Sequence, residues 1–389
     1  MSSVMKTAAV RRSRRDQAAQ AGDGYDFLLW VAFAILFVVG LVMVGSSSTA
    51  IADRQFGQPF HYLWRQMLYA GLALLLAYGV LHIPLRWWER MGGPLLLLAL
   101  GLLVLVLIPG IGREVNGSTR WIPLGIANFQ PSEMMKLVMV VYLAGYLVRR
   151  SEEVRSAVSG FIKPMVVLAL SCLLLLMEPD FGAAAVLMAT AMGMLFLGGV
   201  RIWQFSVLIA LVIAALAALA IMSPYRIERI TAFLDPWADP FASGFQLTQA
   251  LIAFGRGEWF GVGLGSSIQK LFYLPEAHTD FLFAVIAEEL GLVFSLFIIA
   301  LFALIVVRAF VIGRRAERAG QVFAAYLAYG YGMWIGIQAF INIGVNMGIL
   351  PTKGLTLPFM SYGGSSLIMS CLVIALLQRV AYETAQGGR

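Results

Sequence analysis

The chain has 389 residues, of which 60% are hydrophobic and only 13% are charged, and its mean hydropathy is +0.83. Soluble domains carry about 25% charged residues, so this composition excludes a soluble domain and a disordered chain. It indicates a bundle of membrane-spanning helices, each of which needs about 20 mainly apolar residues. The formal net charge of +7 comes from arginines clustered between apolar runs. That pattern is typical of membrane proteins and argues against a nucleic-acid partner.

Ten apolar segments follow one another along the chain, and each is predicted to be a transmembrane helix. They lie at residues 27–47, 66–84, 94–110, 132–148, 164–178, 181–199, 204–222, 281–306, 322–345 and 362–379. The fifth and sixth segments are separated only by Glu178-Pro179-Asp180, where proline and charge together interrupt a helix. We therefore predict an all-α integral membrane protein with about ten spans.

The distribution of basic residues orients these spans. Four arginines between residues 11 and 15 precede the first span, so we place the N-terminus in the cytoplasm. With ten spans every short cytoplasmic loop is basic, whereas merging the fifth and sixth spans would move Arg314 and Arg315 to the outside. The predicted organisation is a basic cytoplasmic tail over 1–25, a single ten-helix membrane domain over 26–380, and a cytoplasmic tail over 381–389.

One long periplasmic loop, residues 223–279, is predicted between the seventh and eighth spans. Glycines, prolines and aromatic residues alternate with charges in it, as in Phe233-Leu234-Asp235-Pro236-Trp237. Loops of this length are uncommon unless they are functional. The loop is therefore the first place to look for a site.

The sequence contains no motif for nucleotide hydrolysis, for a disulfide or for a cysteine-bound metal. There is no Walker-type phosphate loop, so nothing indicates nucleotide hydrolysis. The two cysteines, Cys172 and Cys371, lie in apolar runs and predict neither a disulfide nor a metal site.

Glu133 and Lys136 open the fourth span at positions i and i+3, so they lie on one helix face and are close enough to pair. Ionisable groups within spans are costly and are candidates for function. The two residues either form a structural ion pair or provide a cationic contact for an anionic ligand at the outer leaflet.

Two further polar pairs lie in later spans. Glu288 and Glu289 are about two turns inside the eighth span, and Asn342 and Asn346 are at i and i+4 at the outer end of the ninth. Each pair could join helices as satisfied buried groups, or could line a polar cavity.

A cluster with Glu276, His278 and Asp280 ends the long loop and enters the eighth span. Partial desolvation of Asp280 at the membrane interface would raise its pKa and make it a better base. The spacing alone also fits an acid favoured by the helix dipole. Ser365 and Ser366, which follow two glycines at the start of the tenth span, either cradle phosphate or form a turn and cap.

These motifs resemble those of the SEDS family, which comprises FtsW, RodA and SpoVE. The matching stretches cover most of the chain outside the N-terminal tail. They are Val115-Asn116-Gly117 with Arg120-Trp121-Ile122, Gln130-Pro131-Ser132-Glu133 with Lys136, Pro179-Asp180-Phe181-Gly182, Tyr225-Arg226 with Arg229, Asp239-Pro240 with Gly244-Phe245-Gln246, the run from Pro275 to Asp280, and Ser361-Tyr362-Gly363-Gly364-Ser365-Ser366. Gln246-Leu247-Thr248-Gln249 and the run from Ala253 to Gly257 resemble the FtsW branch, which serves cell division, more than RodA.

The resemblance implies a SEDS fold and a peptidoglycan glycosyltransferase. Such proteins polymerise lipid II at the outer face of the bacterial cytoplasmic membrane, and the division branch acts at the septum. The implied partners are a class B penicillin-binding protein and other membrane proteins of the divisome. The family's proposed catalytic aspartate falls on Asp280.

The same resemblance suggests a single inverting displacement in which Asp280 accepts the proton of the acceptor hydroxyl and a pyrophosphate leaves. That leaving group needs positive charge, for which Arg120, Lys136 and Arg229 are the candidates. Glu133, Glu276, His278, Ser365 and Ser366 complete the expected substrate-binding set. A divalent cation, Mg²⁺ or Mn²⁺, is an alternative source of charge, although no ligand cluster is visible. Two other functions fit the same sequence: a lipid II flippase and a divisome scaffold.

Overall fold

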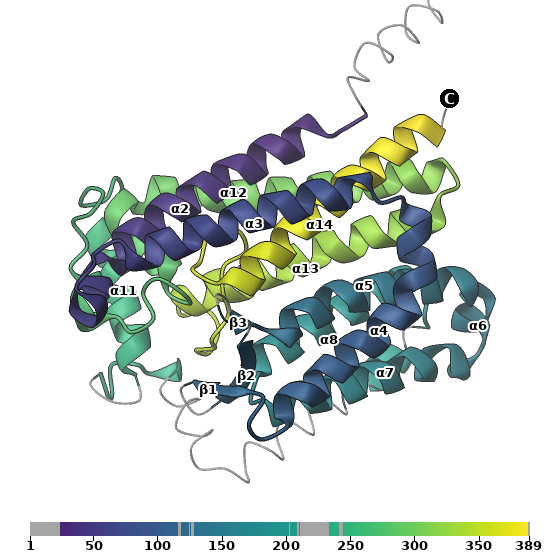
Figure 1. The fold of residues 1–389 in the computed structure, drawn as a ribbon, viewed down its shortest axis with the longest axis horizontal. Coiled ribbons are helices and arrows are strands. Elements are labelled where there is room, and N and C mark those ends of the chain that lie inside the picture. The colour runs from purple at the N-terminus through teal and green to yellow at the C-terminus, as the bar shows by residue number, and fades with distance from the viewer. Residues whose placement is uncertain are drawn as a thin grey trace, which may run out of the picture.

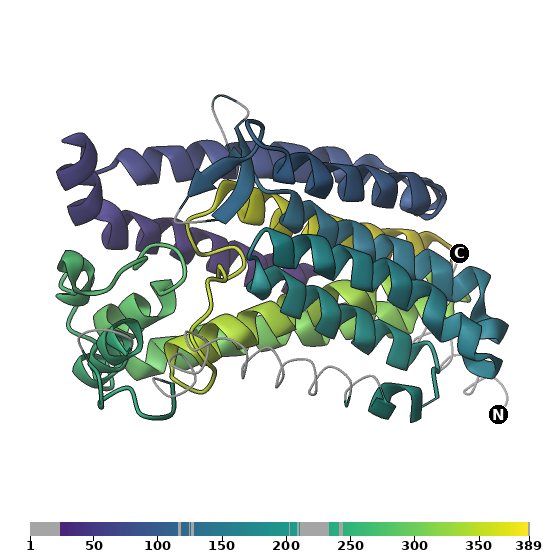
Figure 2. The same cartoon turned by 90° about the horizontal axis from the view of Figure 1, so that it is seen from below.

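The computed structural model describes residues 24–387 except 116–117, 124, 126–127, 202, 208–209, 211–232 and 241–243. Long helices run side by side along one axis, joined by short connections at the two ends of the bundle (Figure 1). The same arrangement of long helices along one axis is seen from below in Figure 2. The first and the last described residues lie at the same end of the bundle, where the Tyr25 and Tyr382 rings stack with centroids 5.0 Å apart.

The first three helices include one long hairpin, formed by the first two. They are α2 (Phe27–Phe56), α3 (His61–His82) and α4 (Leu85–Leu107). Asp26 caps α2 by accepting a hydrogen bond from the Leu29 amide at 3.0 Å, and Gly57 ends it in the left-handed conformation at φ 65°. The first and third helices are longer than the predicted apolar runs, because polar turns extend α2 beyond residue 47 and Pro94 lies within α4.

The helical fold class is confirmed, and a small antiparallel sheet after α4 adds strands that were not predicted. Its strands are β1 (Arg113–Val115), β2 (Ser118–Pro123) and β3 (Asn128–Phe129), in the order β1-β2-β3. The register pairs Glu114 with Thr119 and Ile122 with Phe129. The strands are too short to give a clear alternation of apolar and polar residues, so the sequence did not reveal them.

The next group of helices is α5 (Pro131–Arg149), α6 (Ser151–Ser156), α7 (Val158–Met177) and α8 (Phe181–Leu197). The predicted break between the fifth and sixth spans is confirmed, since α7 ends before Glu178 and α8 begins after Asp180. Asp180 caps α8 by accepting a hydrogen bond from the Ala183 amide at 3.1 Å.

The last third of the chain contains α11 (Phe245–Gly257), the π-helical turn η1 (Gln269–Tyr273), α12 (Leu282–Arg318), α13 (Val322–Asn346) and α14 (Gly364–Gly387). The predicted long loop is therefore partly helical, because α11 and η1 lie within it. Residues 223–232 of that loop lie outside the described part of the chain. Helix α12 bends at Gly291, which has φ 78° and ψ −177°.

Among the described residues, seven helices are long and apolar enough to cross a membrane: α2, α3, α4, α5, α7, α12 and α14. Helix α8 is apolar but has only 17 residues. Helix α13 has 25 residues, but tyrosines and amides dilute its apolar character. The predicted seventh span, 204–222, lies largely outside the described residues, so the number of ten spans stays a prediction.

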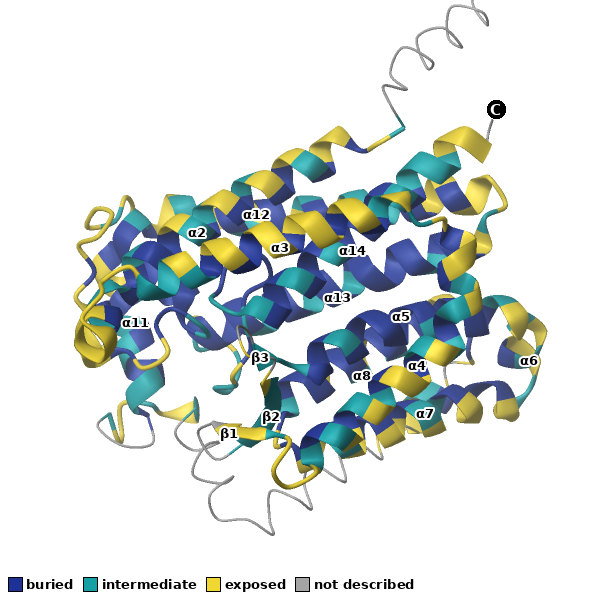
Figure 3. Cartoon of the chain, viewed as in Figure 1, coloured by how far each residue is buried: buried dark blue, intermediate teal, exposed yellow. Residues whose placement is uncertain are grey.

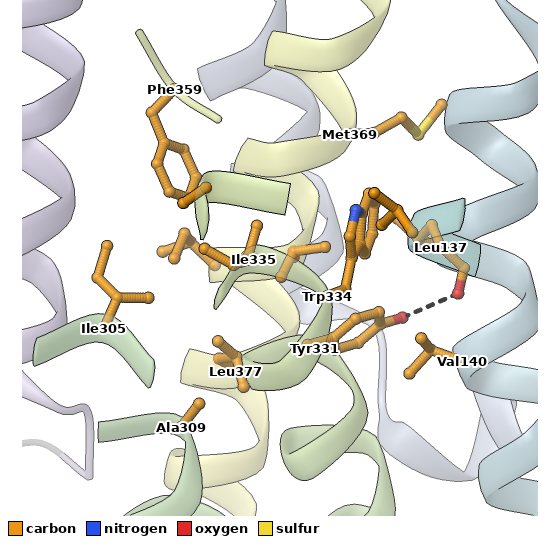
Figure 4. Close-up of a cluster of buried hydrophobic side chains, with 14 of the residues drawn as sticks. Leu137, Val140, Ile305, Ala309, Tyr331, Trp334, Ile335, Phe359, Met369 and Leu377 are labelled. Carbon is orange, nitrogen blue, oxygen red and sulfur yellow. Dashed lines mark hydrogen bonds between the residues drawn. The ribbon is translucent and has the colours of Figure 1, made fainter. Parts of the chain in front are cut away.

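The core of the bundle lies around α5 and α13, which are dark blue along most of their length in Figure 3. Trp334, Tyr331 and Leu137 pack together there, and the Tyr331 hydroxyl lies 3.5 Å from the Leu137 carbonyl (Figure 4). Helices α12 and α13 approach closely, because a Cβ on Gly332 would lie 2.8 Å from the Ala309 Cβ. Small residues at such contacts allow close packing of membrane helices.

Candidate active site

A cavity of about 310 Å³ opens where the sheet, the α7–α8 turn, the segment before α12 and the segment before α14 meet. Its walls come from parts of the chain that are up to 248 residues apart, from Ser118 to Ser366. Most of its side chains are polar: Ser118, Arg120, Gln130, Glu133, Asp180, Glu276, Thr279, Asp280, Thr356, Tyr362 and Ser366. Five of the residues predicted from the sequence thus meet in one cavity, namely Arg120, Glu133, Glu276, Asp280 and Ser366.

Asp280 lies two residues before α12 and presents a half-buried carboxylate to this cavity. No described residue donates a hydrogen bond to that carboxylate, and Gly354 leaves room for it, since a Cβ there would lie 3.0 Å from Asp280 Oδ2. The pKa of Asp280 is raised to about 7, mainly by burial and to a smaller extent by the nearby Glu276 carboxylate, while Arg120 opposes the rise. A carboxylate with this pKa is well suited to general-base chemistry near neutral pH.

Arg120 brings a positive charge to the same cavity from strand β2. Its Nε donates to the Glu178 carbonyl at 3.1 Å, and its Nη2 donates to the Pro179 carbonyl. The guanidinium thus ties the sheet to the α7–α8 turn. Glu178 itself is fully buried, and desolvation, with a smaller contribution from Asp180, raises the pKa of its carboxyl to about 8.

Glu133 and Lys136 pair within α5, with Lys136 Nζ 2.8 Å from Glu133 Oε1. Lys136 also donates to Gln338 Oε1 at 2.8 Å and lies 5.2 Å from the Trp334 ring centroid. Glu133 lines the cavity, whereas Lys136 lies beneath it and is only 2% exposed. The second oxygen of Glu133, Oε2, is buried and has no hydrogen-bond partner among the described residues. The geometry therefore favours the ion-pair interpretation of these two residues.

Glu276 and His278 lie in different surroundings, since Glu276 is exposed and His278 is buried. Glu276 lines the cavity, is exposed, and accepts a hydrogen bond from Thr279 Oγ1 at 2.6 Å. His278 packs its ring against Tyr62 and Tyr362, at centroid distances of 4.8 and 5.6 Å. Burial lowers the pKa of His278, so its neutral form is favoured, and its carbonyl accepts a hydrogen bond from the Tyr362 amide at 2.9 Å.

The two serines at the start of α14 are also separated in role. Ser366 lines the cavity, with its Oγ 2.8 Å from Thr356 Oγ1. Ser365 lies behind it, where its Oγ accepts from the Gln130 amide at 3.0 Å and donates to the Asn128 carbonyl at 3.2 Å. Ser365 thus anchors the start of α14 to the sheet.

Four further residues line the cavity that were not predicted as site residues: Gln130, Asp180, Thr356 and Tyr362. Asp180 accepts hydrogen bonds from Gln130 Nε2 at 3.2 Å and from Ser132 Oγ at 3.0 Å. Asp180 could have been predicted as a site residue from its position in the Glu178-Pro179-Asp180 break between two spans. Arg229 lies outside the described residues.

The described walls of the cavity carry four carboxylates, on Glu133, Asp180, Glu276 and Asp280, and one guanidinium, on Arg120. Within the described ranges, no group of three histidine, cysteine, aspartate or glutamate side chains is arranged to bind a metal ion. Among these described carboxylates, the one on Asp280 accepts no hydrogen bond. The cation in the same cavity, Arg120, is oriented by its bonds to the Glu178 and Pro179 carbonyls.

A membrane-embedded helical bundle with a polar cavity at one end defines the class of this protein, and comparison with known proteins defines the family. A family model described as cell cycle protein, FtsW/RodA/SpoVE, matches residues 26–386. The chain belongs to this family.

The relatives include proteins named probable peptidoglycan glycosyltransferase FtsW. The one from Nitrosococcus halophilus is 65% identical over 92% of this chain and 92% of its own length. The one from Thioalkalivibrio sulfidiphilus is 56% identical over 99% of this chain and 96% of its own length.

Two solved structures have the same fold. One concerns the structural coordination of polymerization and crosslinking by a peptidoglycan synthase complex; its TM-score is 0.76 at 31% identity, over 92% of this chain and 98% of that chain. The other is the rod shape determining protein RodA of Thermus thermophilus, with a TM-score of 0.68 at 29% identity over 92% and 97% of the two chains.

Proposed function

We propose that this protein is a peptidoglycan glycosyltransferase that polymerises lipid II into glycan strands during septal cell-wall synthesis. The observation that carries the proposal is the Asp280 carboxylate, which faces a polar cavity at one end of a membrane bundle. Lipid II joins a polar sugar to an apolar carrier, so a site for it must lie where the membrane meets water. The names of the relatives, peptidoglycan glycosyltransferase FtsW, agree with this function.

The proposed reaction is a single inverting displacement. Asp280 accepts the proton of the acceptor sugar's 4-hydroxyl, and the oxygen attacks the anomeric carbon of the growing strand. The bond from that carbon to undecaprenyl pyrophosphate breaks, and the pyrophosphate takes the electron pair. The raised pKa of about 7 makes Asp280 a base of suitable strength for this step.

Arg120 is the described cation that lines the cavity, so we assign it to the pyrophosphate. Lys136 acts indirectly, because it neutralises Glu133 beneath the cavity floor. Arg229 remains a candidate for the same role. A divalent cation, Mg²⁺ or Mn²⁺, would supply charge of the same kind if it bound among the cavity carboxylates; no step of the proposed reaction depends on it.

The proposed location is the bacterial cytoplasmic membrane at the division septum, with both termini in the cytoplasm and the cavity on the outer side. The proposed partners are a class B penicillin-binding protein, which would crosslink the strands, and other membrane proteins of the divisome. Support for the first partner comes from the similar structure that concerns polymerization and crosslinking in one synthase complex.

The test is polymerisation of labelled lipid II by the purified protein, with and without its transpeptidase partner. Asp280→Asn preserves the size of the side chain and removes its basicity, so strand synthesis is expected to disappear while membrane level and partner binding stay unchanged. Normal strand synthesis by this variant would contradict the role of Asp280. Transfer of lipid II across vesicles without any strand formation by the wild type would favour a flippase, and a partner complex without either activity would favour a scaffold.

A further inference from the structure

Three buried amide side chains form a row on α13. Gln338, Asn342 and Asn346 are spaced by four residues, so they lie above one another on one helix face. All three are 2% exposed or less. A buried amide needs hydrogen-bond partners, and each of these three donates to a backbone carbonyl of a residue that lines the cavity.

Two of these amides, on Asn342 and Asn346, bond the backbone of Asp280. Asn342 Nδ2 and Asn346 Nδ2 each donate to the Asp280 carbonyl oxygen at 2.9 Å. Asn346 Oδ1 also accepts a hydrogen bond from the Ala284 amide at 3.0 Å. The two asparagines thus hold both the residue that carries the carboxylate and the first turn of the helix that follows it.

This support comes from another helix because α12 lacks a cap of its own. Its N-cap residue is Phe281, which makes no side-chain capping bond. The first amides of a helix need partners from outside it, and Asn346 supplies one from α13. Since no described residue bonds the Asp280 carboxylate itself, its position depends on the backbone that the asparagines fix.

The same row also holds the opposite wall of the cavity. Asn342 Nδ2 donates to the Leu355 carbonyl, and Gln338 Nε2 donates to the Thr356 carbonyl at 3.0 Å. Leu355 and Thr356 both line the cavity, as does Asp280. One face of α13 therefore sets the distance between the two walls.

We propose that Asn342 and Asn346 are positioning residues, which hold the Asp280 carboxylate at the place where it meets the acceptor hydroxyl. This inference rests on the proposed function. It differs from a purely structural role, in which the asparagines would only join α12 to α13 and would contribute no more to catalysis than any other buried amide.

The chain offers a matched control for that distinction. Gln378 is fully buried in α14, donates to the Asp26 carbonyl at 2.8 Å and accepts from the Asp26 amide at 2.7 Å. These bonds lie at the end of the bundle where Tyr25 stacks on Tyr382, away from the cavity. Gln378→Leu removes the same kind of bond as Asn346→Leu, without touching the segment of Asp280.

The experiment compares Asn346→Leu, Gln378→Leu and the wild type in complex with the transpeptidase partner, using labelled lipid II. A displacement of about 1 Å at a reacting group costs on the order of 100-fold in rate. We therefore expect kcat to fall roughly 10- to 100-fold in Asn346→Leu, with KM for lipid II unchanged. In Gln378→Leu we expect both constants to stay at the wild-type level, even where the thermal midpoint falls equally.

A second readout is the pH dependence of kcat. Glu276, Arg120 and Asp180 set the charge around Asp280, and Glu133 lines the same cavity; none of these changes in the variant. Loss of the asparagine bonds would give the carboxylate more access to water, so the acidic limb is expected to move to lower pH. An unshifted limb together with wild-type kcat would contradict the proposal.

A third readout does not depend on activity. Amide hydrogen exchange at residues 280–284 is expected to rise in Asn346→Leu, because the Ala284 amide loses one of its two acceptors and keeps only the Phe281 carbonyl, at 3.1 Å. If Asn346→Leu does not accumulate, Asn342→Leu replaces it, since Asn346 then keeps its bonds to both the Asp280 carbonyl and the Ala284 amide; we expect a smaller fall in kcat. Equal kcat in the asparagine variant and Gln378→Leu would overturn the positioning role, whereas a wild-type complex that makes no strands would overturn the proposed function itself.

Discussion

The protonation of Asp280 should govern the pH dependence of strand synthesis. Its pKa is raised to about 7, first by burial and then by Glu276. The ionised form is the base, so activity is expected to fall as the pH drops through about 7. Glu276→Gln removes a charge that raises the pKa, and the acidic limb should therefore move to lower pH.

The measurement is the initial rate of polymerisation across the pH range for the wild type and Glu276→Gln. Because Glu276 is exposed, water screens its charge and the shift should be small compared with the effect of burial. Glu258→Gln is the control, since Glu258 is an exposed carboxylate that does not line the cavity. A limb that moves upward in Glu276→Gln, or equally in both variants, would contradict this assignment.

The Lys136–Glu133 pair gives a second prediction at the level of single residues. Lys136→Met leaves the Glu133 carboxylate buried without its partner, which typically costs about 3–5 kcal/mol. We expect little folded protein and no strand synthesis. Adding Glu133→Gln removes the unpaired charge, so the double variant should recover both folded yield and activity.

The recovery separates two roles of Lys136. Folded yield is measured by thermal unfolding in detergent, and activity by polymerisation of lipid II. Lys136 lies beneath the cavity floor and is bonded to Glu133 and Gln338, so recovery of both is the expected result. A double variant that folds normally but makes no strands would show that the ammonium itself acts on the substrate.

At the scale of elements, the bend in α12 holds the segment that leads to Asp280. The segment from Gly257 to Gly263 packs against α12 where the helix bends at Gly291. The Val262 amide donates to the Glu288 carbonyl at 3.0 Å, and the Leu292 amide donates to the Glu258 carbonyl at 2.9 Å. Glu288 and Glu289 point out of the bend to Arg256 and Lys270, at 2.6 and 2.7 Å. The two buried glutamates are thus satisfied anchors of this segment.

Gly261→Ala should break this contact. Gly261 has φ 81°, and a Cβ there would lie 2.2 Å from the Glu289 carbonyl oxygen. Left-handed backbone costs about 1–2 kcal/mol for a residue with a Cβ, and overpacking adds about 1–3 kcal/mol. We expect a clear fall in the thermal midpoint of unfolding and loss of activity.

Gly265→Ala is the matched control for Gly261→Ala. Gly265 has φ 83°, but nothing lies within 4 Å of its added Cβ, so only the backbone strain remains. Its thermal midpoint should fall much less. Equal losses in the two variants would mean that the close approach to α12 contributes nothing.

The elements differ in how far the sequence predicted them. The α7–α8 break followed from Pro179 and its charged neighbours, because local chemistry alone interrupts the helix there. The convergence of Asn342 and Asn346 on Asp280 could not be predicted, since it depends on how α12 and α13 are aligned. Ser365 and Ser366 were predicted together, but the helix start turns one toward the sheet and the other into the cavity.

At the scale of the whole molecule, the two ends of the described chain lie together, which agrees with the predicted even number of spans. Arg308 bonds Asp26 at the start of α2 through Nε at 3.1 Å, and Arg379 bonds the Leu81 carbonyl at 3.0 Å. The basic turns between α5 and α7 and between α12 and α13 lie at this same end of the bundle (Figure 1). By the positive-inside rule we predict that this end faces the cytoplasm and that the cavity of Asp280 faces the outer side.

Labelling of single cysteines can test this orientation. Cys172 and Cys371 are buried, so the background should be low. Pro123 is exposed at the end of β2, beside the cavity, and Ala319 is exposed in the turn between α12 and α13 at the other end. In intact spheroplasts a membrane-impermeant maleimide is expected to label Pro123→Cys and to leave Ala319→Cys unmodified, whereas both should react after permeabilisation. Labelling of Ala319→Cys alone in intact spheroplasts would place Asp280 on the cytoplasmic face, on the opposite side of the membrane from the cell wall. That result would contradict both the proposed orientation and the reaction assigned to this cavity.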